Sequence, residues 1–287
     1  TPVMCVIGNP PYSGESANKG EWIMKLMEDY KKEPGGKEKL NERNPKWIND
    51  DYVKFLRYGQ YYIEKNGSGI LAYINPHGFL DNPTFRGMRW HLLKTYDKIY
   101  TIDLHGNSKK KETAPDGSVD QNVFDIQQGV SINIFVKTGK KKATELGKVF
   151  HYDLYGKREV KYDFLRENTI SQIAFKELPN VAPMYFMVQK DFEAKAVYDK
   201  GFAVNELFPL NNVGVVTSRD SFVIDENKTI VENRIRDFFT LEKEHIISKH
   251  GLRENKSWKI YEVKKKAIGF MESDIQQVSY RPFDNRY

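Results

Sequence analysis

The stretch VIGNPPYSG, residues 6–14, decides how the fold of this 287-residue chain starts. Five apolar residues, 3–7, predict a buried strand that leads directly into the motif. A residue before proline is pushed out of the helical region, and a proline fixes its own φ and has no N–H to donate. Asn9, Pro10 and Pro11 therefore predict a stiff, extended hook whose carbonyl oxygens are free to face a ligand.

The chemistry of this hook rests on two acceptors and one ring. The side-chain oxygen of Asn9 and the backbone oxygen of Pro10 both accept hydrogen bonds, and Tyr12 adds a flat aromatic face. This set suits a planar base that carries an exocyclic amino group. Asn and Pro are also ordinary turn residues, so the alternative is a turn that only terminates the strand.

Asn-Pro-Pro-Tyr at the carboxyl end of a strand resembles the catalytic motif of S-adenosylmethionine-dependent amino-methyltransferases, above all those that act on adenine N6 in DNA. Five further segments resemble, in order, the methylase part of type ISP restriction–modification enzymes. These are KWINDDYVKFLRYGQ (46–60), PTFRGMRWHLL (83–93), IDLHGNSKKKE (102–112), NVFDIQQGVSI (122–132) and YRPFDNRY (280–287). Enzymes of that family are single polypeptides that combine nuclease, ATP-driven motor, methylase and target-recognition domains.

The resemblance implies an α/β fold: the C-terminal half of a Rossmann-like methyltransferase sheet, followed by a smaller mixed α+β domain. The apolar pattern agrees, because runs typical of strands alternate with stretches of helical spacing. We predict strands at 3–8, 69–75, 98–104 and 129–137, and helices at 47–65 and 84–97. The glycines of NGSG, residues 66–69, predict a turn from helix to strand rather than a cofactor loop.

By the same resemblance, the intact enzyme uses S-adenosylmethionine and double-stranded DNA. In that family a glycine-rich turn for the cofactor and an acidic residue for its ribose precede the Asn-Pro-Pro-Tyr motif. Only eight residues precede Asn9 here, and the chain contains no Phe-x-Gly-x-Gly. We therefore expect a piece of a longer polypeptide that lacks most of the cofactor pocket and is inactive alone. Its partners would be an upstream cofactor-binding half, a motor domain and a nuclease domain.

The resemblance also makes Asn9, Pro10, Pro11 and Tyr12 the catalytic motif. The two oxygens of the hook would hold the two hydrogens of the amino group, so that the nitrogen lone pair points at the sulfonium methyl. An adenine within a duplex has to be flipped out, and aromatic faces then replace the lost stacking. Tyr12 would cover one face, and Phe124 the other. The alternative is that Phe124 fills the core beside its apolar neighbours.

Other candidates for contacts with DNA are basic. They are Arg86, Arg89, Lys109, Lys110, Lys111 and Arg219. The arginines at 86 and 89 share one face of a predicted helix, whereas lysine runs are commonly solvated surface and Arg219 is equally a turn residue. His77 ends a strand at the same sheet edge as the hook, where it lines the site or caps a turn. No Cys/His cluster has the spacing of metal ligands, so no metal is expected.

The composition limits the kinds of partner and compartment that are expected for this chain. The formal net charge of +6 and the pI near 9.0 permit a polyanionic partner, although such charge is also common in proteins that bind no nucleic acid. No apolar run reaches the roughly 18 residues that span a bilayer, so no membrane partner is expected. Cys5 is the single cysteine, which agrees with a reducing cytoplasm, and its place in an apolar strand predicts a buried thiol.

We expect three regions along the chain. Residues 1–150 would form the C-terminal part of the methyltransferase catalytic domain, and 151–175 a β-hairpin or linker around Tyr155-Gly156-Lys157. Residues 176–287 lose the α/β rhythm and, by resemblance, begin the target-recognition region that reads DNA. Base readout requires side chains placed in three dimensions, so the contacting residues do not follow from the sequence.

Three other functions remain open at this point. A cytosine-N4 methyltransferase could use a similar hook, and so could a protein-glutamine methyltransferase, although the long recognition-like extension disfavours the latter. A third alternative is a DNA-binding module that keeps the fold and has lost the chemistry. The presence of both Asn9 and Tyr12 disfavours this reading.

Overall fold

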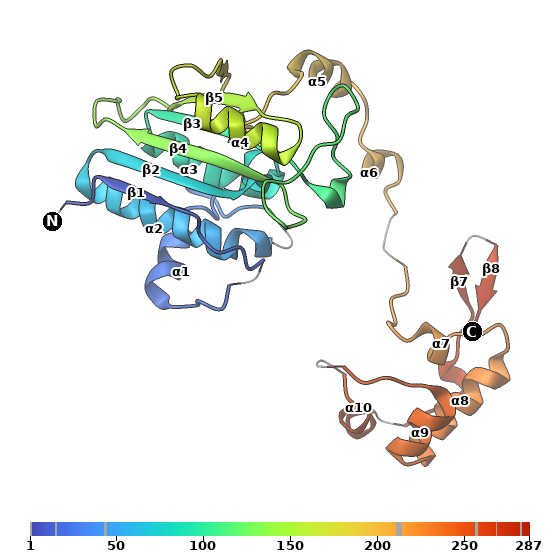
Figure 1. The fold of residues 1–287 in the computed structure, drawn as a ribbon. Helices are drawn as coiled ribbons and strands as arrows, with labels where there is room; N and C mark the ends of the chain where they lie inside the picture. Colours follow the sequence, from blue (N-terminus) through green and yellow to red (C-terminus); the bar gives the residue numbers. More distant parts are fainter. Residues whose placement is uncertain are drawn as a thin grey trace. The chain divides into compact units, whose positions relative to one another are not determined.

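The computed structural model describes residues 2–14, 16–42, 45–210, 214–255, 258–267, 269–281 and 283–287. The chain divides into two compact units, residues 1–195 and residues 196–287. Each unit has its own core and is described by itself. Figure 1 shows the sheet of the first unit and the short helices of the second.

A mixed sheet of six strands forms the centre of the first unit, in the order β1-β2-β4-β3-β5-β6. The strands are β1 (Cys5–Gly8), β2 (Gly69–Pro76), β3 (Lys98–Asp103), β4 (Val130–Lys137), β5 (Lys148–Asp153) and β6 (Lys176–Leu178). β1 is parallel to β2 and β3 is parallel to β5, whereas β4 is antiparallel to both β2 and β3. The carboxyl ends of β1, β2, β3 and β5 therefore meet at one edge of the sheet.

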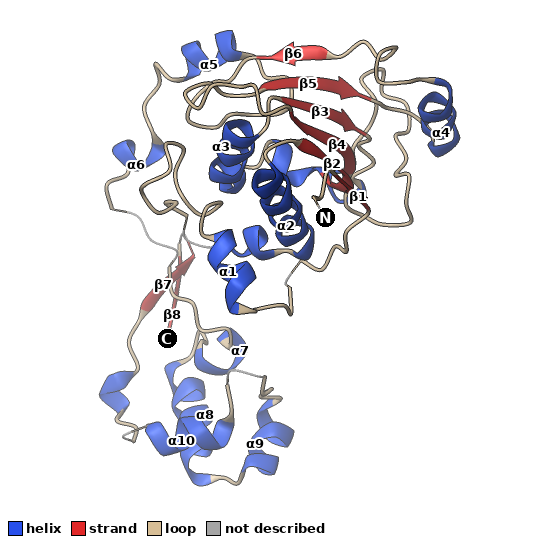
Figure 2. Ribbon diagram, turned by 90° about the vertical axis from the view of Figure 1, so that its left-hand side faces the viewer, coloured by secondary structure: helices blue, strands red, loops and turns tan. Residues whose placement is uncertain are grey.

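Helices lie on both faces of this sheet (Figure 2). Helices α2 (Asp51–Asn66) and α3 (Arg86–Thr95) cover one face, α1 (Glu21–Met27) packs on α2, and α4 (Arg158–Glu167) lies on the opposite face. Helix α2 ends at Gly67, whose φ of 86° is the left-handed conformation that glycine adopts at low cost. The predicted turn from helix to strand at NGSG is thus confirmed. Helix α5 (Phe192–Tyr198) follows β6.

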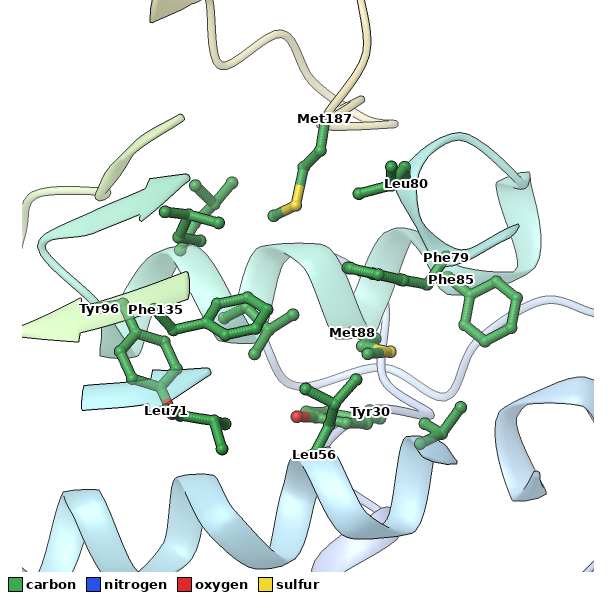
Figure 3. Packing of buried hydrophobic residues seen from close by; sticks show 14 of the residues in the cluster. Tyr30, Leu56, Leu71, Phe79, Leu80, Phe85, Met88, Tyr96, Phe135 and Met187 are labelled. Atoms are coloured by element: carbon green, nitrogen blue, oxygen red, sulfur yellow. The ribbon is translucent and has the colours of Figure 1, made fainter. Parts of the chain in front are cut away.

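The main core lies between the sheet and the layer of α2 and α3. Figure 3 shows Leu56, Leu71, Met88 and Phe135 converging there from α2, β2, α3 and β4. All four are fully buried, and burial of an apolar side chain of this size stabilises the fold by about 1.5–3 kcal/mol. A second, smaller cluster on the other face joins Ile102, Leu104, Val123, Val130, Leu154 and Ile173 with residues of α4.

The strands predicted inside the sheet are confirmed, but the two ends of the first unit differ from expectation. Cys5 is exposed, and Ile7 keeps 79% of its surface open to solvent. The predicted burial of the first strand is wrong because β1 lies at the edge of the sheet and pairs, among the described residues, with β2 alone. In the segment 151–175, for which a β-hairpin or linker is expected, β5 ends at Asp153 and helix α4 follows.

The second unit consists mainly of short helices. They are α6 (Val204–Leu207), α7 (Asp220–Val223), α8 (Lys228–Thr240), α9 (Lys243–His250) and α10 (Ile260–Lys266). Strands β7 (Val278–Arg281) and β8 (Asp284–Arg286) form an antiparallel pair. Phe222, Phe238, Ile246 and Ile260 form its buried core. Of the helices in the described ranges, none combines the length and the apolar character that crossing a bilayer requires.

Candidate functional site

The Asn-Pro-Pro-Tyr hook leaves the end of β1 at the edge where the parallel strands terminate. Asn9 and Pro11 are exposed, Pro10 is buried, and Tyr12 is half-buried. The Tyr12 hydroxyl lies 2.7 Å from Oδ1 of Asn9 and 3.1 Å from the backbone oxygen of Ile74. Burial raises the pKa of Tyr12 to about 12, so the phenol remains protonated and can donate at neutral pH. Tyr12 thus orients the side-chain oxygen of Asn9 and keeps the hook on the end of β2.

A carboxylate that the sequence did not single out holds the far side of the hook. Asp50 accepts hydrogen bonds from the backbone N–H groups of Ser13 at 3.1 Å and Gly14 at 2.9 Å. Asp50 is also the N-cap residue of α2, but its side chain makes no cap hydrogen bond to the helix. An aspartate at this position ordinarily caps the helix. Here its carboxylate is instead committed to the hook, which is thereby fixed to both β2 and α2.

Tyr12 and Phe124 pack against the same small cluster, on the face of the sheet that carries α4. Both are partly buried, and Tyr12 also packs against the main core. Phe124 also lines an open cavity of about 650 Å³ together with Gly106, Ser108, Asn122, Ile126 and Arg158. Its ring is therefore neither a full core residue nor a freely exposed one. The structure brings the two aromatic rings predicted from the sequence to one region of the molecule.

Charged side chains from the ends of β2, β3 and β5 form a second group at this edge. His77 Nδ1 lies 2.9 Å from Asp103, and His105 lies between Glu112 (3.0 Å from Nδ1) and Asp153 (2.9 Å from Nε2). Burial alone would lower the pKa of His105, but these hydrogen bonds outweigh it and raise the pKa to about 9. His105 is therefore an imidazolium at neutral pH, held by two carboxylates.

His77, Asp103 and His105 also place one ligand atom each within 4.8 Å of one another, a spacing that the sequence did not reveal. The imidazole nitrogens already have hydrogen-bond partners. Nε2 of His77 faces Nδ2 of Asn107 at 3.4 Å, which is a donor, so the tautomer that fits has its proton on Nδ1, directed at Asp103. The cluster thus satisfies itself as a hydrogen-bonded ionic network. His77 belongs to this network rather than to a simple turn cap.

Two of the predicted DNA contacts are structural residues. Arg86 is buried and forms ion pairs with Glu33 and Glu42. Arg89 is fully buried, and its guanidinium donates to the backbone oxygens of Phe79, Asn82 and Met184. The prediction that both contact DNA is wrong because both side chains are buried against protein acceptors. For Arg86 these include Glu33 and Glu42, 53 and 44 positions away, which helical spacing cannot reveal.

The remaining basic candidates differ in their surroundings. Lys109, Lys110 and Lys111 are exposed on the short turn after Asn107, so they are accessible to a phosphate, and their role stays a prediction. Arg219 lies in the second unit, where its guanidinium stacks on the Trp258 ring at 3.9 Å. That contact accounts for the conformation of Arg219 within its own unit, and its contact with DNA likewise stays a prediction.

Two parts of the chain match known protein families. Residues 4–109 match the sequence profile of the Eco57I restriction-modification methylase family, and residues 206–287 match that of the type ISP C-terminal specificity domain. No curated protein sequence matches the chain significantly.

Three solved structures share the fold. A DrdV–DNA complex matches with a TM-score of 0.64 and 22% identity, over 99% of this chain and 30% of that chain. The ATP-dependent type ISP restriction-modification enzyme LlaBIII bound to DNA matches with a TM-score of 0.60 and 21% identity, over 83% of this chain and 16% of that chain. A nuclease-deletion mutant of the type ISP enzyme LlaGI with a DNA substrate mimic matches with a TM-score of 0.61 and 21% identity, over 100% of this chain and 25% of that chain. This chain thus spans less than a third of the length of each structure.

The first profile match makes residues 4–109, which include the hook and the first strands of the mixed sheet, similar to restriction–modification methylases. The second match is more particular. In this chain a segment that matches the methylase profile is followed by one that matches the type ISP C-terminal specificity domain, which confirms the resemblance found in the sequence.

Proposed function

We propose that the chain contributes the base-binding part and the specificity domain of a type ISP enzyme that methylates adenine N6 in DNA, with S-adenosylmethionine as the methyl donor. The observation that carries this proposal is the hook: Asn9 is exposed at the carboxyl edge of the sheet, and the Tyr12 hydroxyl orients its side-chain oxygen. A turn that only ended a strand would not require an oriented, solvent-facing amide.

In the proposed reaction, Asn9 Oδ1 and the Pro10 backbone oxygen accept the two hydrogens of the adenine amino group. Oδ1 has two lone pairs, so it can accept one hydrogen bond from Tyr12 and a second from the base. The amino nitrogen is then held with its lone pair directed away from the ring plane. Fixed dipoles of this kind stabilise the positive charge that develops on nitrogen. Bound S-adenosylmethionine supplies the methyl group as a sulfonium.

The base reaches the hook after it has left the duplex, and two rings support it there. Unstacking costs a few kcal/mol, and stacking on aromatic side chains returns roughly 1–3 kcal/mol per base. Tyr12 and Phe124 are proposed as these rings, because both border the same cluster and Phe124 opens into a cavity. The exposed lysines at 109–111 are proposed to contact phosphates next to the flipped base.

The cofactor is proposed to bind mainly to an upstream half of the same polypeptide, the side from which motor and nuclease domains would also connect. The support comes from β1, where Ile7 remains 79% exposed and Cys5 is accessible. A central strand of an α/β sheet is buried on both faces, so an apolar strand with such exposure is suited to receive a further strand. The added strands would then complete the sheet of the first unit as a Rossmann-like sheet, and this chain alone would not transfer methyl groups.

The test is Asn9→Ala in the full enzyme that contains this chain. Loss of an oriented acceptor at the reacting group is expected to lower kcat for DNA methylation about 100-fold or more while DNA binding is retained. Asn180→Ala is the matched control, because Asn180 hydrogen-bonds the Gly147 carbonyl away from the hook.

The product identifies the reaction class in the same experiment. N6-methyladenine supports the proposal, whereas N4-methylcytosine or a methylated protein amide would replace it by one of the alternatives. Full activity of the Asn9→Ala enzyme would remove the hook from the mechanism.

A further inference from the structure

Helix α4 directs its polar side chains at one loop, residues 120–125, which carries Phe124. Arg158 donates from Nε to the Asn122 carbonyl at 2.8 Å and pairs with Asp125 at 2.7 Å. The Tyr162 hydroxyl donates to the Val123 carbonyl at 2.6 Å. Arg158 and Tyr162, one turn apart on the helix, therefore hold the backbone carbonyls of the two residues that directly precede Phe124.

Lys161 lies between them and is the centre of this arrangement. Its side chain is fully buried, and Nζ donates to the carbonyls of Leu104 and Gln121, each at 2.6 Å, and contacts Asp120 at 2.8 Å. Asp120, whose side chain is equally buried, also accepts from the backbone N–H groups of Gly106 at 2.6 Å and Gly156 at 2.8 Å. One ion pair thus joins the segments that follow β3 and β5 to the start of the Phe124 loop.

Asn122 carries this support to Phe124 itself. Its side-chain amide donates to the carbonyls of Gly106 at 3.2 Å and Gln128 at 2.8 Å, and its Oδ1 accepts from the Phe124 N–H at 2.9 Å. Gly106 permits the contact, since a Cβ built there would lie 2.4 Å from Cα of Asn122. Both ends of the loop are therefore fixed, and the N–H of Phe124 is held within it.

A buried Lys–Asp pair is a poor device for stability alone. The cost of removing both charges from water often matches the attraction between them, so a buried pair is weak evidence for stability, and in some proteins such pairs select one conformation. Here every proton of the ammonium group has a named acceptor on a loop at the carboxyl edge. The ion pair of Lys161 and Asp120 therefore fixes the positions of the loops at the carboxyl edge of the sheet.

We propose that α4 is the element that positions Phe124 for base stacking, with Lys161 as the central positioning residue and Tyr162 as a second one. This inference rests on the proposed function, in which Phe124 supports the flipped base. Lys161 and Tyr162 do not touch the base themselves. They act through the loop and hold the Phe124 ring at the rim of its cavity before DNA binds. The entropic cost of ordering this loop is therefore not added to the cost of base flipping.

The test uses the full enzyme with two DNA substrates. A target site that carries 2-aminopurine in place of the target adenine reports base flipping by fluorescence, and the unmodified site is used to measure kcat and KM. Tyr162→Phe removes one hydroxyl and keeps the ring. We expect it to lower both the fluorescence increase and kcat about three- to tenfold, as for the loss of one partly buried hydrogen bond, with KM for DNA within about twofold. Lys161→Met should have a larger effect in the same direction. Glu167→Gln is the matched control, since Glu167 lies in the last turn of α4 and is exposed.

Coupling to Phe124 separates positioning from general damage. Phe124→Ala alone should reduce flipping and kcat. If α4 acts through Phe124, adding Tyr162→Phe to Phe124→Ala should produce little further loss, because the two changes remove the same interaction. Equal effects of Tyr162→Phe with and without Phe124 would overturn the inference, as would wild-type flipping in both Tyr162→Phe and Lys161→Met. A wild-type result for Phe124→Ala would instead overturn the stacking role in the proposed function.

Discussion

At the scale of single residues, Tyr12 combines two roles that substitution can separate. Its ring borders the small core cluster, and its hydroxyl orients Asn9. Tyr12→Phe keeps the ring and removes the orienting hydrogen bond. We expect kcat for methylation by the full enzyme to fall roughly three- to tenfold, the effect of losing one hydrogen bond, while KM for DNA changes little.

Tyr12→Ala provides the comparison for this prediction. It removes the stacking face as well, so base flipping measured by 2-aminopurine fluorescence should fall together with kcat. If Tyr12→Phe were as inactive as Tyr12→Ala, orientation of Asn9 by the hydroxyl would account for the whole effect of Tyr12 on kcat, and stacking by its ring would be excluded.

At the scale of elements, the turn at 105–112 is held by an imidazolium between two carboxylates, and this should make its stability depend on pH. The pKa of His105 is raised to about 9 in the folded chain, against an ordinary value near 6.5 when unfolded. A raised pKa stabilises the fold fully below about pH 6.5, and the contribution disappears as the pH rises through about 9. The same hydrogen bonds lower the pKa of Glu112 to about 2, so that carboxylate stays ionised throughout this window.

The prediction is read from thermal unfolding of the wild type and of His105→Gln between pH 6 and pH 10. The wild type should be more stable at pH 6, by up to about 3 kcal/mol, and this advantage should shrink toward zero near pH 10. His245→Gln is the control, because His245 lies in the second unit outside this network. A constant difference across the range would show that His105 does not titrate between its two carboxylates.

The elements that the sequence predicted are those that local pattern specifies. The alternation within 129–137 and the glycines at 66–69 describe a strand and a turn in terms of neighbouring residues alone. Helix α4 escaped prediction because the residue at its centre, Lys161, is satisfied by acceptors that lie 40 or more positions away. Arg86 and Arg89 were misassigned for the same reason, since a charged residue with helical spacing carries no sign of the distant partners that bury it.

In the candidate site, too, the parts that could be predicted from the sequence are those determined by neighbouring residues. The Asn-Pro-Pro-Tyr hook could be predicted because two prolines dictate its backbone locally, and it lies exposed at the expected edge. Asp50 could not, because it lies at the start of α2, 36 positions from Gly14. The group around His105 could not either, because strand topology alone brings the ends of β2, β3 and β5 together. Spacing along the chain therefore identified the chemistry of the hook but not the residues that hold it in place.

At the scale of the whole molecule, the open side of β1 is the feature that the proposed upstream half has to cover, and Ile7 tests this directly. In the isolated chain Ile7 is 79% exposed, so Ile7→Lys should change the free energy of unfolding by no more than about 0.5 kcal/mol. In the full enzyme the added strand would bury this position. The lysine should then destabilise the methylase domain by about 2 kcal/mol or more, since a buried charge without a partner is costly, and should weaken S-adenosylmethionine binding measured by calorimetry. Ile170→Lys, at an exposed position beyond α4, should be silent in both contexts. If Ile7→Lys were equally silent in the full enzyme, β1 would remain an open edge there, and the cofactor-binding half would have to dock elsewhere.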